Sequence, residues 1–113
     1  MITTKITKEL EDRESFESQA EAVLIDAESQ AKCELALWYD EEEGYLAEIA
    51  HLSVPAAFRQ KGIAKALIEE AKTFTRKEWG EDLSCRAIPE HDEPMTAEQL
   101  TAFYEKMGLS VRG

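Results

Sequence analysis

The sequence predicts a single α/β (α+β) domain, built as a mixed, mostly antiparallel sheet flanked by helices. Two patterns support this prediction. The first half of the chain has short apolar or alternating runs separated by polar turns, which is typical of strands joined as hairpins. The second half alternates strand-like runs with segments whose apolar residues recur at helical spacing. Because a strand–helix–strand unit joins parallel neighbours by a right-handed crossover, both kinds of strand pairing are expected.

The first half of the chain predicts four strands. They are expected at residues 2–6, 22–27, 33–39 and 45–54. The heavily charged segment 7–22 predicts a short helix or a loosely packed connection. The run Asp40-Glu41-Glu42-Glu43-Gly44 predicts a hairpin loop, because adjacent carboxylates stay solvated and a glycine tolerates positive φ.

The strand at 45–54 is expected to be central. Strict alternation assigns its residues to two faces, with Leu46, Glu48, Ala50 and Leu52 on one and Tyr45, Ala47, Ile49 and His51 on the other. Both faces are largely apolar, which indicates a strand covered on two sides. Pro55 should end the strand pairing, because proline has no N–H to donate.

The second half predicts two amphipathic helices and two short strands. The first helix is expected from Gly62 to Trp79 and should end at Gly80. A strand at 83–88 and an acidic loop at 89–94 follow. Thr96 begins the second helix with a T-x-x-Q capping box, and Leu109 opens a short final strand.

Length and composition favour a soluble globular protein. The chain has 113 residues, 43% of them hydrophobic and 33% charged, which suits one domain with its own core. No apolar run approaches the ~20 residues of a membrane span, and the first residues lack a signal-peptide core. Cys33 and Cys85 lie in apolar strand-like contexts and predict buried, reduced thiols. A cytoplasmic location is therefore expected.

The net charge of −11 bears on the kind of partner. It disfavours nucleic acid, whose phosphates would be repelled, and favours a cationic partner such as an amine. A role in solubility alone would also explain it. However, six of the 13 basic residues lie between Arg59 and Lys77, and such a basic island predicts an anionic cofactor there.

A strand followed by a basic loop and a helix N-terminus is an arrangement that suits a phosphate group. Unpaired amides of the loop and first helical turn can converge on an anion, and the helix dipole favours negative charge. Arg59-Gln60-Lys61-Gly62-Ile63-Ala64 matches the [RQ]-x-x-G-x-[GA] signature of the GNAT family of N-acetyltransferases. The run Phe103-Tyr104-Glu105-Lys106-Met107-Gly108-Leu109 resembles the second motif of that family, commonly FYxKxGF.

This resemblance implies transfer of an acetyl group from acetyl-CoA to a primary amine by direct attack. It implies that backbone groups of Leu52 and Val54 follow the pantetheine arm. The pyrophosphate would lie at the loop and first helical turn, formed by Arg59, Gln60, Lys61, Gly62, Ile63 and Ala64. A side chain at Gly62 is expected to obstruct the approach of phosphate to the backbone.

Three residues are candidates for catalysis, and no metal site is predicted. Glu48 is a carboxylate on an otherwise apolar strand and could take the proton of the amine, although pairing with a basic residue would also explain it. His51 can exchange a proton near neutral pH, and its alternative is a partly buried structural histidine. The resemblance places the hydroxyl of Tyr104 at the cofactor sulfur, whereas its helical spacing also fits a core tyrosine. Cys33 and Cys85 are expected to be packing residues.

A second interpretation is a catalytically inactive GNAT-like module that binds CoA or another protein. The region before the first hairpin has room for about one of the two helices usual in the family, and little chain follows Leu109. These departures leave acceptor recognition open. A second subunit could complete the acceptor pocket, so a homodimer is one expectation.

Overall fold

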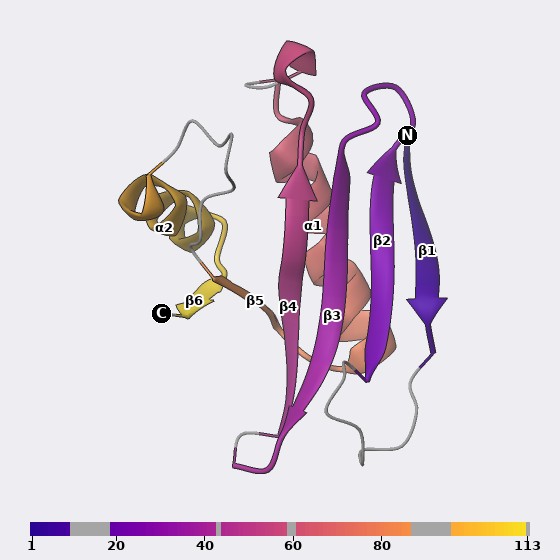
Figure 1. The fold of residues 1–113 in the computed structure, drawn as a ribbon, viewed down its shortest axis with the longest axis vertical. Coiled ribbons are helices and arrows are strands. Elements are labelled where there is room, and N and C mark those ends of the chain that lie inside the picture. Colours follow the sequence, from indigo (N-terminus) through magenta and orange to yellow (C-terminus); the bar gives the residue numbers. More distant parts are fainter. Residues whose placement is uncertain (10–18, 43, 59–60, 87–95, 113) are drawn as a thin grey trace.

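The computed structural model describes residues 1–9, 19–42, 44–58, 61–86 and 96–112. Figure 1 shows the order of its elements along the chain. The strands are β1 (Ile2–Lys8), β2 (Ala20–Asp26), β3 (Lys32–Asp40), β4 (Gly44–Ser53), β5 (Leu83–Arg86) and β6 (Ser110–Arg112). The helical segments are the 3-10 turn η1 (Ala56–Phe58), α1 (Ile63–Phe74), the π-helical turn η2 (Thr75–Trp79) and α2 (Ala97–Lys106). The expected loop at 89–94 and most of the charged connection at 7–22 lie outside the described residues.

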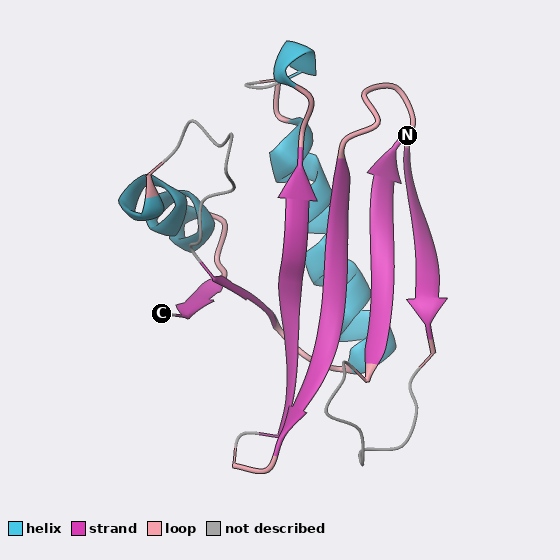
Figure 2. Ribbon diagram, viewed as in Figure 1, coloured by secondary structure: helices cyan, strands magenta, loops and turns pink. Residues whose placement is uncertain are grey.

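The six strands form one sheet in the order in which they occur along the chain. Strands β1 to β4 pair antiparallel, whereas β4 pairs parallel with β5 and β5 pairs parallel with β6. Figure 2 shows this sheet with α1 lying across one of its faces. The mixed, mostly antiparallel sheet predicted from the sequence is therefore confirmed.

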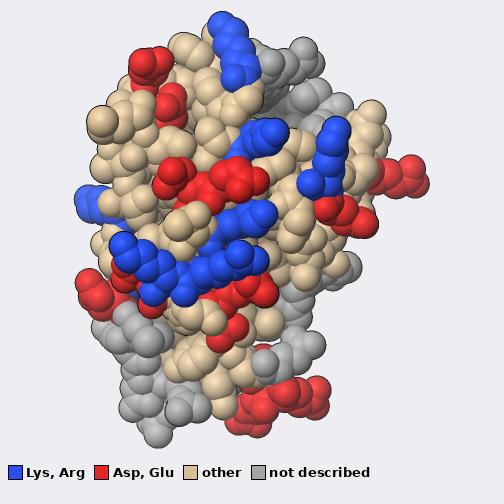
Figure 3. All heavy atoms as spheres, turned by 180° about the vertical axis from the view of Figure 1, so that it is seen from behind, with Lys and Arg blue, Asp and Glu red and all other residues tan. Residues whose placement is uncertain are grey.

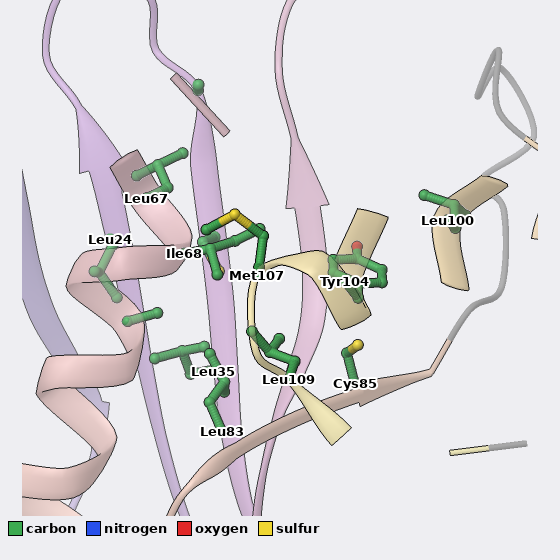
Figure 4. Close-up of a cluster of buried hydrophobic side chains, with 13 residues drawn as sticks. Leu24, Leu35, Leu67, Ile68, Leu83, Cys85, Leu100, Tyr104, Met107 and Leu109 are labelled. Atoms are coloured by element: carbon green, nitrogen blue, oxygen red, sulfur yellow. The ribbon is translucent and has the colours of Figure 1, made fainter. Parts of the chain in front are cut away.

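The main core lies between the sheet and the two helices. Leu67, Ile68 and Ala71 of α1 are fully buried in one cluster with residues of β2 and β3. Residues of α2, including Tyr104 and Met107, belong to the same cluster (Figure 4). The apolar spacing that predicted the two helices thus marks the faces that they bury.

The alternation predicted for β4 is wrong beyond Ile49, because the strand contains a β-bulge. Leu35 pairs with Ile49 and the preceding Glu34 pairs with His51, so Ala50 is an extra residue opposite β3. A bulge shifts all later side chains by one position. Leu52 and Val54 consequently pack against the same core as Ile49. His51 lies on the other face of the sheet, together with Glu48.

Both predicted helices are present, with one irregularity. The first helix ends at Gly80 as predicted, but its last turn is π-helical instead of α-helical. The second helix has the predicted capping box. The backbone N–H of Gln99 donates to Thr96 Oγ1 at 3.2 Å, and the backbone N–H of Thr96 donates to Gln99 Oε1 at 2.9 Å.

Candidate active site

The strands β4 and β5 part in the middle of the sheet. Their pairing joins Ala47 to Leu83 and Glu48 to Ser84, and within the described residues it ends there. Beyond this point β5 turns away from β4 and pairs only with β6 (Figure 1). The edge of β4 from Ile49 onwards is therefore not covered by β5 in the part of the chain that the structure describes.

Ser84 fixes the place where the two strands part. Its buried hydroxyl donates a hydrogen bond to the carbonyl oxygen of Ala47 at 2.9 Å. This bond ties β5 to β4 at the last paired position. Ser84 was not expected to have this role, because nothing in a short strand pattern indicates where pairing ends.

The N-terminus of α1 has the features of an anion site. Among the described residues no side chain caps it, and its first turn contains no acidic residue. By contrast, α2 has a complete capping box. Four amides at the start of any α-helix lack a partner within the helix, so an uncapped end can donate them to a bound anion.

The residues expected around the pyrophosphate are only partly described. Gly62 is the N-cap of α1, and Ile63 and Ala64 are its first helical residues. Lys61 is exposed, and its ammonium lies 5.6 Å from the ring centroid of Phe58. Arg59 and Gln60 lie outside the described residues, so their positions stay predictions.

The backbone conformation at position 62 favours glycine, in addition to the room that a bound phosphate would need there. Its φ of +78° lies in the left-handed region, where L-residues are strained. Apart from its two chain neighbours, no atom of the described residues lies within 4 Å of a Cβ at this position. The expected obstruction could therefore affect only a ligand, and the structure adds a second reason for glycine that the sequence alone did not indicate.

Basic and acidic side chains are mixed on the face that carries α1. Figure 3 shows Lys and Arg side chains gathered across this face, with Asp and Glu side chains between them. Lys65 is exposed on α1, as are Glu69 and Glu70 one turn further along. The basic island predicted from the sequence is thus not a uniformly positive surface.

Glu48 lies at the point where β4 and β5 part. It is half-buried, with Oε2 enclosed by the protein, and its strand neighbours are Ala36 on β3 and Ser84 on β5. Burial, with a further contribution from the charge of Glu48, raises the pKa of the nearby Cys85 thiol to about 12. Cys85 therefore stays protonated near neutral pH and is not a nucleophile.

Cys33 is inert for the same reason. Burial and the charge of Glu34 raise the pKa of its thiol to about 12. Both cysteines are free and buried in the main core. Their prediction as reduced packing residues is confirmed.

The bulge at Ala50 brings two candidate residues to one face. His51 lies opposite Glu34 on β3 and, because of the extra residue, on the same face as Glu48. Strict alternation would have separated them. β-Bulges often re-aim side chains beside functional sites, but no sequence signal indicated this one.

Tyr104 lies in the main core. It is 7% exposed, and its ring is 5.5 Å from that of Phe103. Ile49 and Leu52 of β4 pack against the cluster that contains Tyr104. Figure 4 shows the hydroxyl at the end of the ring farther from Cys85. The interpretation as a core residue is therefore confirmed, and its proposed contact with a cofactor sulfur stays a prediction.

Among the described residues, no group of three or more His, Cys, Asp or Glu side chains is placed to hold a metal ion. The described helices include none with the length and apolar character needed to cross a membrane.

The mixed sheet with flanking helices is the fold of acetyltransferases of known structure. An aminoglycoside acetyltransferase from an uncultured soil metagenomic sample superimposes with a TM-score of 0.60 at 22% identity, over 88% of this chain and 64% of that one. Glucosamine-6-phosphate N-acetyltransferase from Arabidopsis thaliana superimposes with a TM-score of 0.55 at 20% identity, over 83% of this chain and 61% of that one. The chain thus spans less than two thirds of each of these structures.

The family follows from the sequence match. The acetyltransferase (GNAT) domain model matches residues 19–109, and the chain belongs to this family. The resemblance that rested on two short motifs is therefore confirmed over most of the chain. No curated protein sequence matches it.

Proposed function

We propose that this protein is an acetyl-CoA-dependent N-acetyltransferase that acts on a primary amine by direct attack. The observation that carries the proposal is the parting of β4 and β5 after Glu48 and Ser84, in a chain of the GNAT family. The uncapped N-terminus of α1 follows the end of β4 by a short loop. A site for an extended ligand and a site for its phosphates would thus lie along one continuous stretch of chain.

The residues of this stretch suit the parts of CoA. The backbone of Leu52 and Val54 would bind the pantetheine arm while their side chains stay packed in the core. The amides of Gly62, Ile63 and Ala64 would bind the pyrophosphate, with Lys61, Arg59 and Gln60 adding donors. Acetyl-CoA would supply an acetyl thioester, which a neutral amine can attack without a covalent enzyme intermediate.

Glu48 would act as the general base. An amine is protonated at neutral pH and must lose a proton before it can attack. Glu48 lies on the last paired position of β4, beside the edge proposed for the cofactor. His51 is on the same face and would assist in proton removal, either directly or through water.

Tyr104 would donate a proton to the departing thiolate. Its hydroxyl would need to lie within hydrogen-bond distance of the sulfur, and the proton donated there would be replaced from solvent. Overall, the nitrogen loses two protons, one to Glu48 before attack and one from the tetrahedral adduct to solvent. Tyr104 donates one proton to the departing thiolate and recovers one from solvent, so one proton is released per transfer.

A primary amine is the acceptor class that the charge favours. The net charge of −11 attracts cations, and both structural relatives are named for acceptors that contain amino sugars. The cytoplasmic location and the homodimer expected from the sequence stay predictions.

Two measurements test the proposal. Isothermal titration should show binding of acetyl-CoA, and release of free CoA thiol should depend on an added amine. Absence of heat and of thermal stabilisation at millimolar acetyl-CoA would refute the proposal. Binding without thiol release across a panel of primary amines would instead favour the catalytically inactive CoA-binding module.

A variant tests the role of Tyr104. Tyr104→Phe keeps the ring in the core but removes the hydroxyl. It should lower turnover about 100-fold or more, because general acid catalysis contributes about 10²–10⁴-fold, while the affinity for acetyl-CoA changes little. Unchanged turnover would remove Tyr104 from the mechanism.

A further inference from the structure

A lysine of α1 binds the C-terminal end of α2. Lys72 Nζ donates a hydrogen bond to the carbonyl oxygen of Met107 at 2.8 Å, across 35 residues of sequence. The side chain is only 24% exposed, so the contact is partly shielded from water. The Glu69 carboxylate lies 4.0 Å from the same ammonium, one turn earlier on α1.

The end of α2 leaves the carbonyl of Met107 for Lys72 to bind. The Leu109 amide donates to the Tyr104 carbonyl at 3.1 Å, and the Gly108 amide donates to the Glu105 carbonyl at 2.9 Å. These two bonds form a Schellman motif, with Gly108 at a φ of +83°. The Met107 carbonyl accepts neither bond. An ammonium at this position also lies at the negative end of the helix dipole.

Gly108 leaves room for this contact. A Cβ on Gly108 would lie 3.3 Å from Lys72 Nζ, which is closer than most such contacts. The glycine therefore serves both the left-handed turn and the approach of the ammonium.

We propose that Lys72 is a positioning residue that keeps Tyr104 of α2 in a fixed position relative to α1. This inference rests on the proposed function. Tyr104 is the residue whose carbonyl accepts the amides of both Met107 and Leu109, so its backbone is part of the turn that Lys72 holds. The other end of α1 forms the proposed phosphate site. Lys72 thus links the helix that would bind the cofactor to the helix that carries the tyrosine.

Steady-state kinetics of three variants test this link. Lys72→Met keeps the length of the side chain but removes its charge and donors, and it should lower kcat about 10-fold with less than a 2-fold change in the Kd of acetyl-CoA. Lys72→Arg keeps a donor and should recover most of this loss. Lys5→Met removes an exposed lysine of β1, outside the basic island, and should leave both constants unchanged.

A double variant separates positioning from general destabilisation. If Lys72 acts through the hydroxyl of Tyr104, Lys72→Met should lower kcat less than 2-fold in the Tyr104→Phe protein. An equal loss in both backgrounds would overturn the proposal, because Lys72 would then act independently of the hydroxyl.

Amide hydrogen exchange tests the contact without any activity. In Lys72→Met the amides of Met107, Gly108 and Leu109 should exchange at least 10-fold faster, while those of the β2–β3 pair stay unchanged. Unchanged exchange at 107–109 would overturn the positioning role. If wild-type protein shows no turnover, the proposed function fails and the catalytic part of this inference fails with it. The exchange data still decide whether Lys72 holds the end of α2.

Discussion

Replacing Gly62 by alanine separates the two reasons for a glycine at the start of α1. The residue has a φ of +78°, and within the described part of the chain a Cβ would meet no atom beyond its neighbours within 4 Å. The cost to folding is thus that of the backbone conformation alone. A left-handed conformation costs an L-residue about 1–2 kcal/mol, and the lower entropy of the unfolded alanine chain offsets about 0.4–1 kcal/mol.

The expected net loss of about 0.5–1 kcal/mol corresponds to a small change in Tm. Unfolding entropy of about 2.1 cal/mol/K per residue gives about 0.24 kcal/mol/K for a chain of 113 residues. The Tm should therefore fall by about 2–4 °C. Gly80→Ala is the matched control, because Gly80 has a φ of +70° and the same open surroundings.

The two variants should differ only in their affinity for acetyl-CoA. The methyl group at position 62 would stand where phosphate is proposed to approach, and the loss of one hydrogen bond to a charged group costs about 1.5–3 kcal/mol. Isothermal titration should then show a Kd raised about 10- to 150-fold for Gly62→Ala and unchanged for Gly80→Ala. Equal weakening in both variants, or none in either, would refute the phosphate site at Gly62.

Three further predictions concern stability and thiol chemistry. Ser84→Ala removes the buried hydroxyl that ties β5 to β4, and chemical denaturation should show a loss of about 1–3 kcal/mol; a change below 0.5 kcal/mol would contradict that role. Cys33 and Cys85, each with a pKa of about 12, should be alkylated at pH 8 about a thousandfold more slowly than a free thiol, and rapid modification of folded protein would contradict their burial. Hydrogen bonds from Ser29 hold the pKa of Asp26 below 3.8. The stability that Asp26 contributes is therefore present above that value and lost as pH falls through the lower folded pKa, so the difference in Tm between wild type and Asp26→Asn should shrink in acid.

Local patterns in the sequence predicted the elements well. The capping box of Thr96 and Gln99 and the helix end at Gly80 were expected from single residues, and the structure has both. Such features depend on neighbours a few positions apart, so the sequence alone specifies them. The helical apolar spacing likewise predicted which faces of α1 and α2 are buried.

Features that depend on distant strands could not be predicted. The bulge at Ala50 arises from the register between β3 and β4, and both neighbouring registers satisfy the apolar pattern of this strand. The parting of β4 and β5 depends on where Ser84 meets Ala47, 37 residues away. The contact of Lys72 with Met107 is equally remote. These tertiary contacts give the candidate site its geometry.

The packing of two aromatic rings depends on the number of residues in the π-helical turn η2 between Phe74 and Trp79. The two rings, five positions apart, meet edge to face with centroids 5.2 Å apart, and Trp79 packs against both core clusters. Inserting one residue here would turn the indole by about 100° away from Phe74, whereas deleting one would restore the spacing of four at which α-helical side chains share a face. This turn should therefore tolerate an insertion far less than the solvent-exposed end of the β3–β4 hairpin near Glu41 and Glu42.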